Sequence, residues 1–326
     1  MDKVPVALKE YVMKRSILAV CAVVAIGLAG CSADAASDTA HGSKSETTSA
    51  KDSAPGTQMP TVKLDGVKTR LVFPDSNPPE GLQKDVIDGG EGRDIEETDF
   101  VVANYVGQVW GEESAFDSSF ARGKATGFSL QQVIPGWTKG LAGLKPGAKV
   151  ILSIPADMGY GPSGGNAQAG IGADDTIAFY VEIVDAYGAN QAGDPNATLE
   201  ADLASLPVEI TGNLGEPISI AVKEGTPNPT EVTTTVIARG AGPEIGGEGT
   251  GVYIQYALSP IDNSKPEVSY GEAGPIRSTI GGGSIFDGLT GIPVGSRVLI
   301  MAPASGQAGS GDQPGFAVVV DVLGID

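Results

Sequence analysis

The chain has 326 residues, 41% of them hydrophobic, and a formal net charge of −19. This length favours two folded domains over one, and the acidic balance argues against nucleic acid or anionic lipid as a direct partner. The single histidine, His41, lies in a Ser/Ala/Thr-rich stretch, and both cysteines, Cys21 and Cys31, lie near the N-terminus. We therefore expect no histidine-based catalysis, no metal site, no cofactor, and no disulfide in the folded part.

The N-terminus has the pattern of an export signal, with Lys14-Arg15 before an apolar run over residues 17–29. That run is short for a membrane span, which needs about 20 apolar residues. Leu28-Ala29-Gly30-Cys31 resembles a bacterial lipobox, which implies cleavage before Cys31 and diacylglycerol on its sulfur. An uncleaved anchor is the alternative, and Met13 is an alternative start. We expect a lipid-anchored protein at the extracytoplasmic face of the cell membrane.

Composition divides the remaining chain. After the signal at 1–30, residues 31–61 hold almost no large apolar side chains, which predicts a disordered tether. Residues 189–207 contain a Gly-Asp-Pro turn signal and a weak apolar run, which predicts a linker with one helical turn at 199–206. The two folded domains are then expected at 62–188 and 208–326.

The two folded segments repeat each other. Residues 140–156 align with residues 288–304 at an offset of 148. Shorter matches follow the same order: Val86-Ile87 with Val236-Ile237, Val101/Ala103/Tyr105 with Val252/Ile254/Tyr256, and Phe179-Tyr180-Val181 with Phe316-Ala317-Val318. Matching segments in one order predict a duplicated domain.

The first copy has the pattern of an α+β fold. Strands are predicted at 100–109, 150–154 and 177–184, where β-branched and apolar residues alternate or form short runs. One short helix is predicted after Pro135-Gly136, because Trp137, Leu141 and Leu144 recur at helical spacing before Lys145-Pro146-Gly147. An apolar helix stripe must be covered, which favours an antiparallel sheet curled over the helix.

Aromatic residues of the first copy gather around one carboxylate, although only 6% of the chain is aromatic. Taken singly, Trp137 has an ordinary explanation as core, and Asp117-Ser118-Ser119 as a turn or helix cap. Together they predict an apolar pocket. The elements, in order, are Tyr105, Phe116-Asp117-Ser118-Ser119, Val133-Ile134-Pro135-Gly136-Trp137, Tyr160-Gly161 and Phe179.

The order, spacing and identity of these elements resemble FKBP-type peptidyl-prolyl isomerases, over residues 65–187 and more weakly over 208–326. The resemblance implies, in each copy, an antiparallel sheet wrapped around one short α-helix. It implies that Trp137 is the pocket floor, that Asp117 lies beside the bound carbonyl, and that the Tyr160 hydroxyl and the Ile134 N–H bond the substrate. It places catalytic roles on Asp117, Tyr160, Trp137, Tyr105 and Phe179, and substrate binding on Phe116, Phe128, Val133, Ile134 and Ile171.

Two further points follow from the same resemblance. Arg122 matches a basic residue that pairs with the aspartate. Where the family often has an aromatic residue shortly before Phe128, this chain has Thr126-Gly127, which predicts a thinner pocket wall.

The resulting hypothesis is a prolyl isomerase that acts on X-Pro bonds of exported polypeptides, with macrolide inhibitors as further ligands. Rotation needs no proton transfer, so the lack of histidine is no obstacle. A non-catalytic chaperone or Pro-segment-binding lipoprotein is the alternative. A β-sandwich adhesin is a third, which leaves the Val133–Trp137 motif without explanation.

The second copy lacks the pocket residues and is predicted to fold without catalysing. The position of Trp137 falls at Ile285, the Phe116-Asp117 region becomes Glu267-Val268-Ser269-Tyr270, and the Tyr160 region becomes Gly306-Gln307-Ala308. Tyr256 and Phe316 are expected as core residues of this copy.

Overall fold

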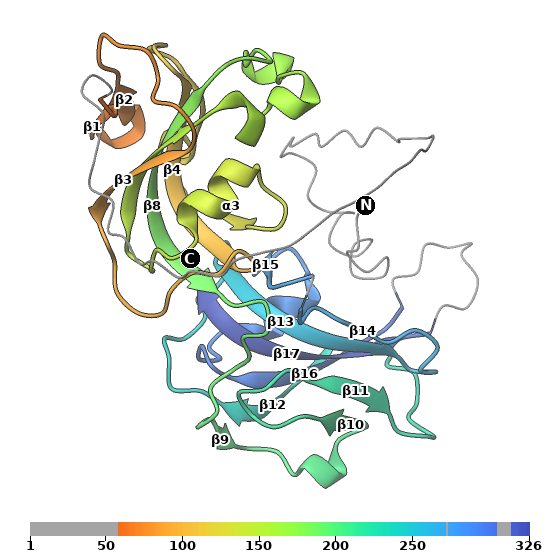
Figure 1. Cartoon of the computed structure of the whole chain (residues 1–326). Helices are drawn as coiled ribbons and strands as arrows, with labels where there is room; N and C mark the ends of the chain where they lie inside the picture. The colour runs from red at the N-terminus through yellow and green to blue at the C-terminus, as the bar shows by residue number, and fades with distance from the viewer. Residues whose placement is uncertain (1–57, 272, 305–313) are drawn as a thin grey trace, which may run out of the picture.

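The computed structural model describes residues 58–271, 273–304 and 314–326, and two antiparallel sheets dominate this part of the chain (Figure 1). The export signal, Cys31, His41 and most of the expected tether lie outside the described residues, as does the 306–308 segment of the second copy. The domain boundaries assigned from composition stay predictions. Among the residues that the structure describes, no helix combines the length and apolar character needed to cross a membrane.

The first sheet has six strands in the order β3-β7-β8-β4-β5, with β6 also paired to β4. These strands are β3 (Gln83–Asp88), β4 (Phe100–Val109), β5 (Ala115–Ser118), β6 (Thr126–Ser129), β7 (Lys149–Ile154) and β8 (Ile177–Tyr187). The three predicted strands are confirmed as β4, β7 and β8, with β8 running on to Tyr187. Each is rich in β-branched and aromatic residues, which suit a pleated surface.

The predicted helix is α3 (Pro135–Leu141), which lies over the inner face of the first sheet (Figure 1). Gly136 and Gly140 allow this close approach, since a Cβ on Gly140 would lie 2.9 Å from the Leu152 side chain of β7. The helix is shorter than its apolar period predicts. It ends at Leu141 and the chain turns at Gly143, where φ is 79°, so Leu144 is buried beyond the helix.

The second sheet has seven strands in the order β14-β13-β17-β16-β12-β9, with β15 also paired to β13. These strands are β9 (Thr198–Leu199), β12 (Thr233–Arg239), β13 (Gly251–Pro260), β14 (Glu267–Val268), β15 (Ile276–Thr279), β16 (Arg297–Ala302) and β17 (Phe316–Ile325). The path β12-β16-β17-β13-β14 repeats the path β3-β7-β8-β4-β5. Even the register shift after Val86 recurs after Val236.

This register corrects one match made from the sequence. Leu152 pairs with Phe179 across β7 and β8, and Ile300 pairs with Val318 across β16 and β17. The counterpart of Phe179 is therefore Val318 and not Phe316. Phe316 is nevertheless buried, as is Tyr256, so the prediction that both are core residues is confirmed.

The expectation of one short α-helix in each copy is wrong in detail. The first copy also has α2 (Ser119–Arg122), and the inner face of the second sheet carries the 3₁₀ helix η6 (Ile285–Leu289) in place of an α-helix. Glycines at 288 and 291 lower helix propensity there. Asp287 accepts hydrogen bonds from the Gly281 and Gly283 amides, which holds a tight turn around the start of η6.

The outer face of each sheet is covered by a hairpin that the sequence did not predict. The hairpins pair β1 (Thr61–Lys63) with β2 (Arg70–Val72), and β10 (Val208–Thr211) with β11 (Ser219–Val222). Leu71 of the first packs with Ile151 and Tyr180, and Ile220 of the second packs with Leu299 and Val319. Both faces of the central strands are therefore buried, which explains their long apolar runs.

The remaining elements are single 3₁₀ turns: η1 (Gly66–Lys68), η2 (Ala156–Met158), η3 (Gly161–Ser163), η4 (Ala167–Ala169) and η5 (Leu203–Ser205). The helical turn predicted in the linker is confirmed as η5. The short strand β9, in the same linker, extends the second sheet beyond β12.

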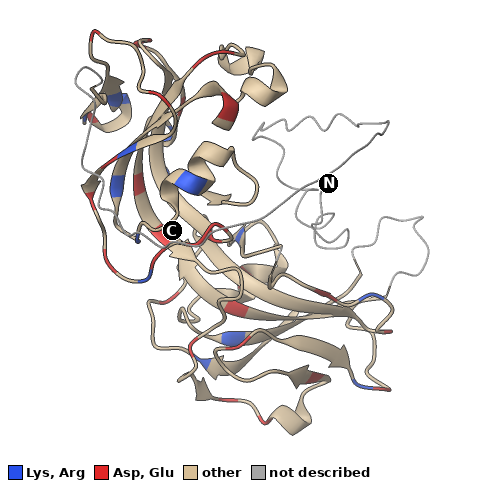
Figure 2. Ribbon diagram, in the orientation of Figure 1, with Lys and Arg blue, Asp and Glu red and all other residues tan. Residues whose placement is uncertain are grey.

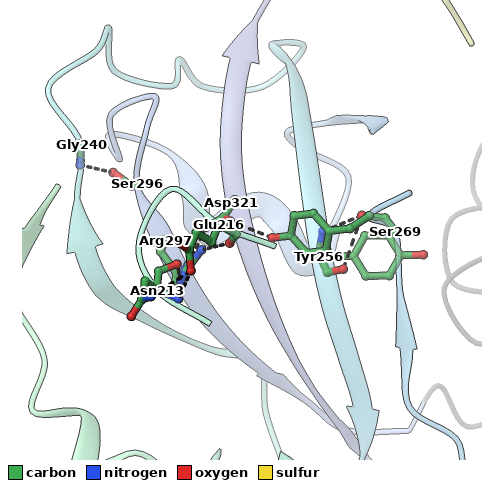
Figure 3. Close-up of polar contacts among 9 residues, drawn as sticks. Asn213, Glu216, Gly240, Tyr256, Ser269, Ser296, Arg297 and Asp321 are labelled. Carbon is green, nitrogen blue, oxygen red and sulfur yellow. Dashed lines mark hydrogen bonds and ion pairs between the residues drawn. The ribbon is translucent and has the colours of Figure 1, made fainter. Parts of the chain in front are cut away.

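Charged residues lie on both sheets and in many loops (Figure 2), and the second sheet contains one deeply buried ion pair. Arg297 is 3% exposed and Asp321 is not exposed, and they face each other through two hydrogen bonds of 2.7 and 2.8 Å (Figure 3). Arg297 also donates to the carbonyls of Asn213 and Glu216, and Tyr270 donates to Asp321. This network ties the β10–β11 turn to the central strands.

The two sheets meet at an interface centred on Tyr253. Its ring centroid lies 5.2 Å from that of Tyr187 and 5.9 Å from that of Phe100. Val102 and Leu323 are buried in the same cluster. Two further hydrogen bonds cross the junction, from the Gln255 side chain and the Gly271 amide to the Ala189 carbonyl.

Several positively charged and hydroxyl groups surround the Asp326 carboxylate at this interface. Arg277 donates to both of its carboxylate oxygens, Tyr253 Oη donates at 3.0 Å, and Lys124 Nζ lies 3.5 Å away. Burial acts to raise the pKa of Asp326, but Arg277, Tyr253 and Lys124 outweigh it and lower this pKa to about 2. The ionised carboxylate is therefore the form that stabilises the interface.

We expect the Asp326→Asn variant to show a weaker acid dependence of stability than the wild type. Because the pKa is lower in the folded state, the carboxylate contributes its stabilisation above about pH 4 and loses it as the pH falls toward about 2. Urea unfolding at several values between pH 2 and pH 5 measures this difference. Equal acid dependence in both proteins would contradict it.

Candidate functional site

Five aromatic side chains converge on the inner face of the first sheet. Trp137 stands at the centre, with the rings of Tyr105, Phe128 and Phe179 at centroid distances of 5.5, 5.1 and 5.2 Å. Phe116 packs edge-on against Phe179 at 5.5 Å. The Trp137 contacts are edge-to-face, the arrangement that aromatic pairs prefer. The sequence-predicted aromatic cluster is thus brought together by α3, β4, β5, β6 and β8.

The side chains of this cluster differ in solvent exposure. Trp137, Tyr105 and Phe179 are 4–5% exposed, whereas Phe116 and Phe128 are half-buried and pack on the same core. Gly107 of β4 permits this packing, because a Cβ there would lie 2.5 Å from the Phe179 ring and 2.6 Å from the Phe116 ring. Sequence reasoning missed Gly107, since nothing in a strand pattern indicates what packs above a glycine.

Asp117 lies at the edge of this cluster and has two strong partners. The Tyr105 hydroxyl donates to one carboxylate oxygen and the Arg122 guanidinium donates to the other. Arg122 also donates to Tyr105 Oη at 2.7 Å and lies over the Tyr105 ring. The predicted pairing of Arg122 with the aspartate is confirmed, and the Tyr105 hydroxyl joins it.

Local sequence explains why Asp117 and Arg122 meet. Ser118 caps α2 by accepting from the Ala121 amide, and Gly123 ends the helix at a φ of 69°. The buried Ser119 hydroxyl accepts from the Tyr105 amide at 2.7 Å, which fixes the start of α2 against β4. The cap interpretation is therefore confirmed for Ser118, while the site role of Asp117 stays a prediction.

The Tyr105 phenol stays protonated well beyond neutral pH. Burial raises its pKa first, and the neighbouring Asp117 raises it further, while Arg122 acts in the opposite direction. A neutral phenol is a hydrogen-bond donor, which matches its bond to Asp117. The Tyr105 hydroxyl thus remains a donor to Asp117 over the physiological range.

The remaining predicted residues lie around the same core. Ile171 is 3% exposed, and Val133, Ile134 and Tyr160 are partly buried against the cluster that contains Trp137. Ile134 precedes the first turn of α3 in extended conformation, so its N–H is not part of the helical hydrogen-bond ladder. Tyr160 directly precedes η3, in the loop that leads back to Ile171. All ten predicted site residues therefore belong to one region.

Gly127 faces away from the pocket, so the thinner wall expected from Thr126-Gly127 stays a prediction. A Cβ on Gly127 would lie 2.5 Å from the Phe100 ring and 3.5 Å from the Tyr253 ring of the second sheet. The space is filled by rings that face away from the pocket, so no larger side chain fits at this position.

The second sheet keeps the frame of this site, with Tyr256 in the place of Tyr105, but lacks three of its other aromatic rings. The Tyr256 amide donates to Ser269 Oγ at 2.7 Å (Figure 3), as the Tyr105 amide does to Ser119. Register places Glu267 where Asp117 stands in the first sheet. The counterparts of three pocket rings are small or aliphatic: Ser278 for Phe128, Ile285 for Trp137, and Val318 for Phe179.

Comparison with known proteins identifies the first sheet. Residues 91–184 match the family model described as FKBP-type peptidyl-prolyl cis-trans isomerase. The chain is 41% identical over 123 residues to the FKBP-type peptidyl-prolyl cis-trans isomerase FkpA of Escherichia coli (strain K12), which covers 37% of this chain and 43% of that protein. It is 35% identical over 106 residues to the outer membrane protein MIP of Legionella longbeachae, covering 32% and 44%.

A crystal structure of FkpA from Escherichia coli matches with 39% identity and a TM-score of 0.31, covering 33% of this chain and 49% of that one. The chain thus spans less than half the length of each of these three matches. The antiparallel sheet with few helices fits the FKBP fold. Residues 91–184 are a domain of the FKBP-type peptidyl-prolyl cis-trans isomerase family.

Proposed function

We propose that this chain is a peptidyl-prolyl cis-trans isomerase that accelerates rotation about X-Pro bonds in exported polypeptides. One observation carries the proposal: the rings of Tyr105, Phe128 and Phe179 surround Trp137, with Asp117 at the edge of the cluster. Membership of residues 91–184 in the isomerase family supports the same assignment. X-Pro isomerisation takes tens to hundreds of seconds unaided, slow enough to limit folding of exported chains.

The chemistry needed is modest. Rotation meets a barrier of about 18–20 kcal/mol because the amide must lose its resonance. A dry aromatic pocket disfavours the planar, well-solvated amide and accepts the twisted one. Lowering the barrier by about 4 kcal/mol gives roughly a thousandfold acceleration. In the proposed complex, the proline ring packs on Trp137.

Asp117 and its partners supply the electrostatic part of the proposed mechanism. A twisted amide nitrogen no longer donates electrons to the carbonyl, so the carbonyl carbon becomes more electron-poor. A carboxylate beside it stabilises that state. Arg122 and Tyr105 hold the carboxylate in place from the other side. The Ile134 N–H and the Tyr160 hydroxyl would position the chain on either side of the rotating bond.

We expect the full chain to catalyse isomerisation in a protease-coupled assay, and Asp117→Asn to lower kcat/KM by roughly tenfold or more. The amide keeps the size of the side chain but removes its charge. The internal repeat offers a matched control, since Glu267→Gln makes the same change at the equivalent position of the second sheet and is expected to leave the rate unchanged. A wild-type chain without activity would refute the proposal.

The second sheet and the membrane anchor complete the proposed function. The second sheet is proposed as a degenerate FKBP-like domain, because its strand order repeats the first while Ile285 and Val318 replace Trp137 and Phe179. We further propose a lipid anchor on Cys31 at the extracytoplasmic face of the cell membrane. A Cys31→Ser variant that remains in the membrane fraction would argue against this anchor.

A further inference from the structure

One segment of the first sheet lies between the aromatic cluster and the second sheet. We call residues 122–129 the wall segment. It begins at the end of α2, turns at Gly123, and continues into β6, which pairs with β4. It therefore contacts both the aromatic cluster around Trp137 and the second sheet.

Toward the pocket, the wall segment provides Arg122 and Phe128. Arg122 bonds both Asp117 and Tyr105 and lies 3.5 Å from Thr126 Oγ1. The Phe128 ring packs edge-on against Tyr105 at 5.4 Å and Trp137 at 5.1 Å. The position of this segment therefore determines where Arg122 lies relative to Asp117 and where the Phe128 ring lies in the pocket wall.

Toward the second sheet, the wall segment provides Lys124, Ala125 and Gly127. Lys124 Nζ lies 3.5 Å from Asp326, and Ala125 packs on the interface cluster that contains Tyr253. Gly127 lies against the Phe100 ring, which in turn contacts Tyr253. A side chain at Gly127 would displace the Phe100 ring.

The second sheet holds its side of this contact rigidly. Tyr253 is 1% exposed, and its hydroxyl bonds Asp326, which Arg277 clamps through two hydrogen bonds. A segment packed against such a fixed surface has fewer accessible positions than a free loop. The half-buried wall segment otherwise has only the four pairs of β6 with β4 as its sheet contacts.

We propose that the second sheet braces the pocket wall, with Tyr253 and Asp326 as positioning residues that act through the wall segment on Arg122 and Phe128. This inference rests on the proposed isomerase function. It assigns a role to the catalytically silent copy: it fixes the geometry of the active one. Neither Tyr253 nor Asp326 contacts the substrate in this account.

The test compares full-length variants in the isomerase assay. Tyr253→Ala is expected to lower kcat/KM about fivefold, mainly by raising KM, because a displaced Phe128 weakens binding of the proline ring. Tyr253→Phe keeps the ring against Phe100 and is expected to restore most of the rate. The double variant Lys124→Gln/Asp326→Asn is expected to lower the rate less, since it leaves the rings in place.

A second ion pair provides the matched control. Arg239 and Glu200 also pair across two segments of the second sheet, but they are exposed and lie away from the wall segment. Arg239→Gln/Glu200→Gln is expected to keep the wild-type kcat and KM. Circular dichroism confirms that the second sheet of each variant is folded.

The outcomes separate the brace from the isomerase function. An active wild type with unchanged kcat and KM in a folded Tyr253→Ala variant would overturn the brace alone. An inactive wild type would overturn the proposed function, and amide hydrogen exchange then decides the brace. Faster exchange of residues 126–129 in Tyr253→Ala than in Tyr253→Phe supports it, and equal exchange refutes it.

Discussion

Replacing Asp321 with alanine is expected to lower the free energy of unfolding of the second sheet by about 3–5 kcal/mol. The change leaves Arg297 buried at 3% exposure without its counter-charge and removes the acceptor of the Tyr270 hydroxyl. Burial acts to lower the pKa of Arg297, but Asp321 outweighs it and raises this pKa. A guanidinium keeps its charge even when buried, so the variant cannot relieve the loss by deprotonation.

Two spectroscopic signals distinguish the sheets in this experiment. Both tryptophans pack against the first sheet: Trp137 lies on α3, and Trp110 directly follows β4. Their fluorescence therefore reports on the first sheet and not on the second. Urea unfolding followed by circular dichroism reports on both. We expect Asp321→Ala to shift a circular dichroism transition to lower urea while the fluorescence transition moves little.

Two controls test the physical reason. Replacing both partners, in Arg297→Met/Asp321→Leu, is expected to recover much of the stability, because an apolar pair leaves no buried charge unpaired. Glu200→Gln breaks the exposed pair with Arg239 and is expected to change stability by less than about 1 kcal/mol. A loss of under about 1 kcal/mol in Asp321→Ala would show that the buried pair is not important for stability.

Trp137→Ala is expected to abolish most of the proposed isomerase activity and to lower the stability of the first sheet by about 3–5 kcal/mol. The indole contacts Tyr105, Phe128 and Phe179, so its removal leaves a cavity between three rings and takes away the proposed floor of the pocket. Protease-coupled kinetics and chemical unfolding measure the two effects separately.

Trp110 is the matched control for this substitution. It directly follows β4, on the outer face of the first sheet. Its ring centroid lies 5.2 Å from that of Phe73, and its indole nitrogen donates a hydrogen bond to the Ser76 carbonyl. Trp110→Ala is expected to reduce stability without changing kcat or KM of the folded protein. Retained activity in a folded Trp137→Ala protein would exclude the indole from the site.

The elements that the sequence predicts well are those with long, regular patterns. The strand Phe100–Val109 is found with its predicted bounds because its alternation continues over ten residues. The helix was predicted too long because Leu144 continues the apolar period beyond the glycine turn at Gly143. The hairpins that cover the outer faces were missed, since strands of three or four residues are too short for a periodic signal.

The residues that the structure brings together around Trp137 could be selected from the sequence because they form a recognisable series of motifs. Those motifs do not indicate which residues, distant in sequence, lie against each other in the folded protein. Gly107 and Gly127 have meaning only through the rings that lie against them. Phe316 was matched to Phe179 because both are aromatic, whereas strand register places Val318 there. The role of Arg122 depends on α2, a helix of four residues.

The strand order sets the sequence in which the protein can be completed. In each sheet the last strand to be synthesised, β8 or β17, is inserted between two earlier strands. The first sheet therefore cannot close before Tyr187 has been made, and the second cannot close before Ile325. Until that strand is made, β7 and β4 of the first sheet, and β16 and β13 of the second, each have one edge without its partner, and such long-range pairing is slow. The insertion of β17 is thus the step that joins β13 to β16 and completes the second sheet.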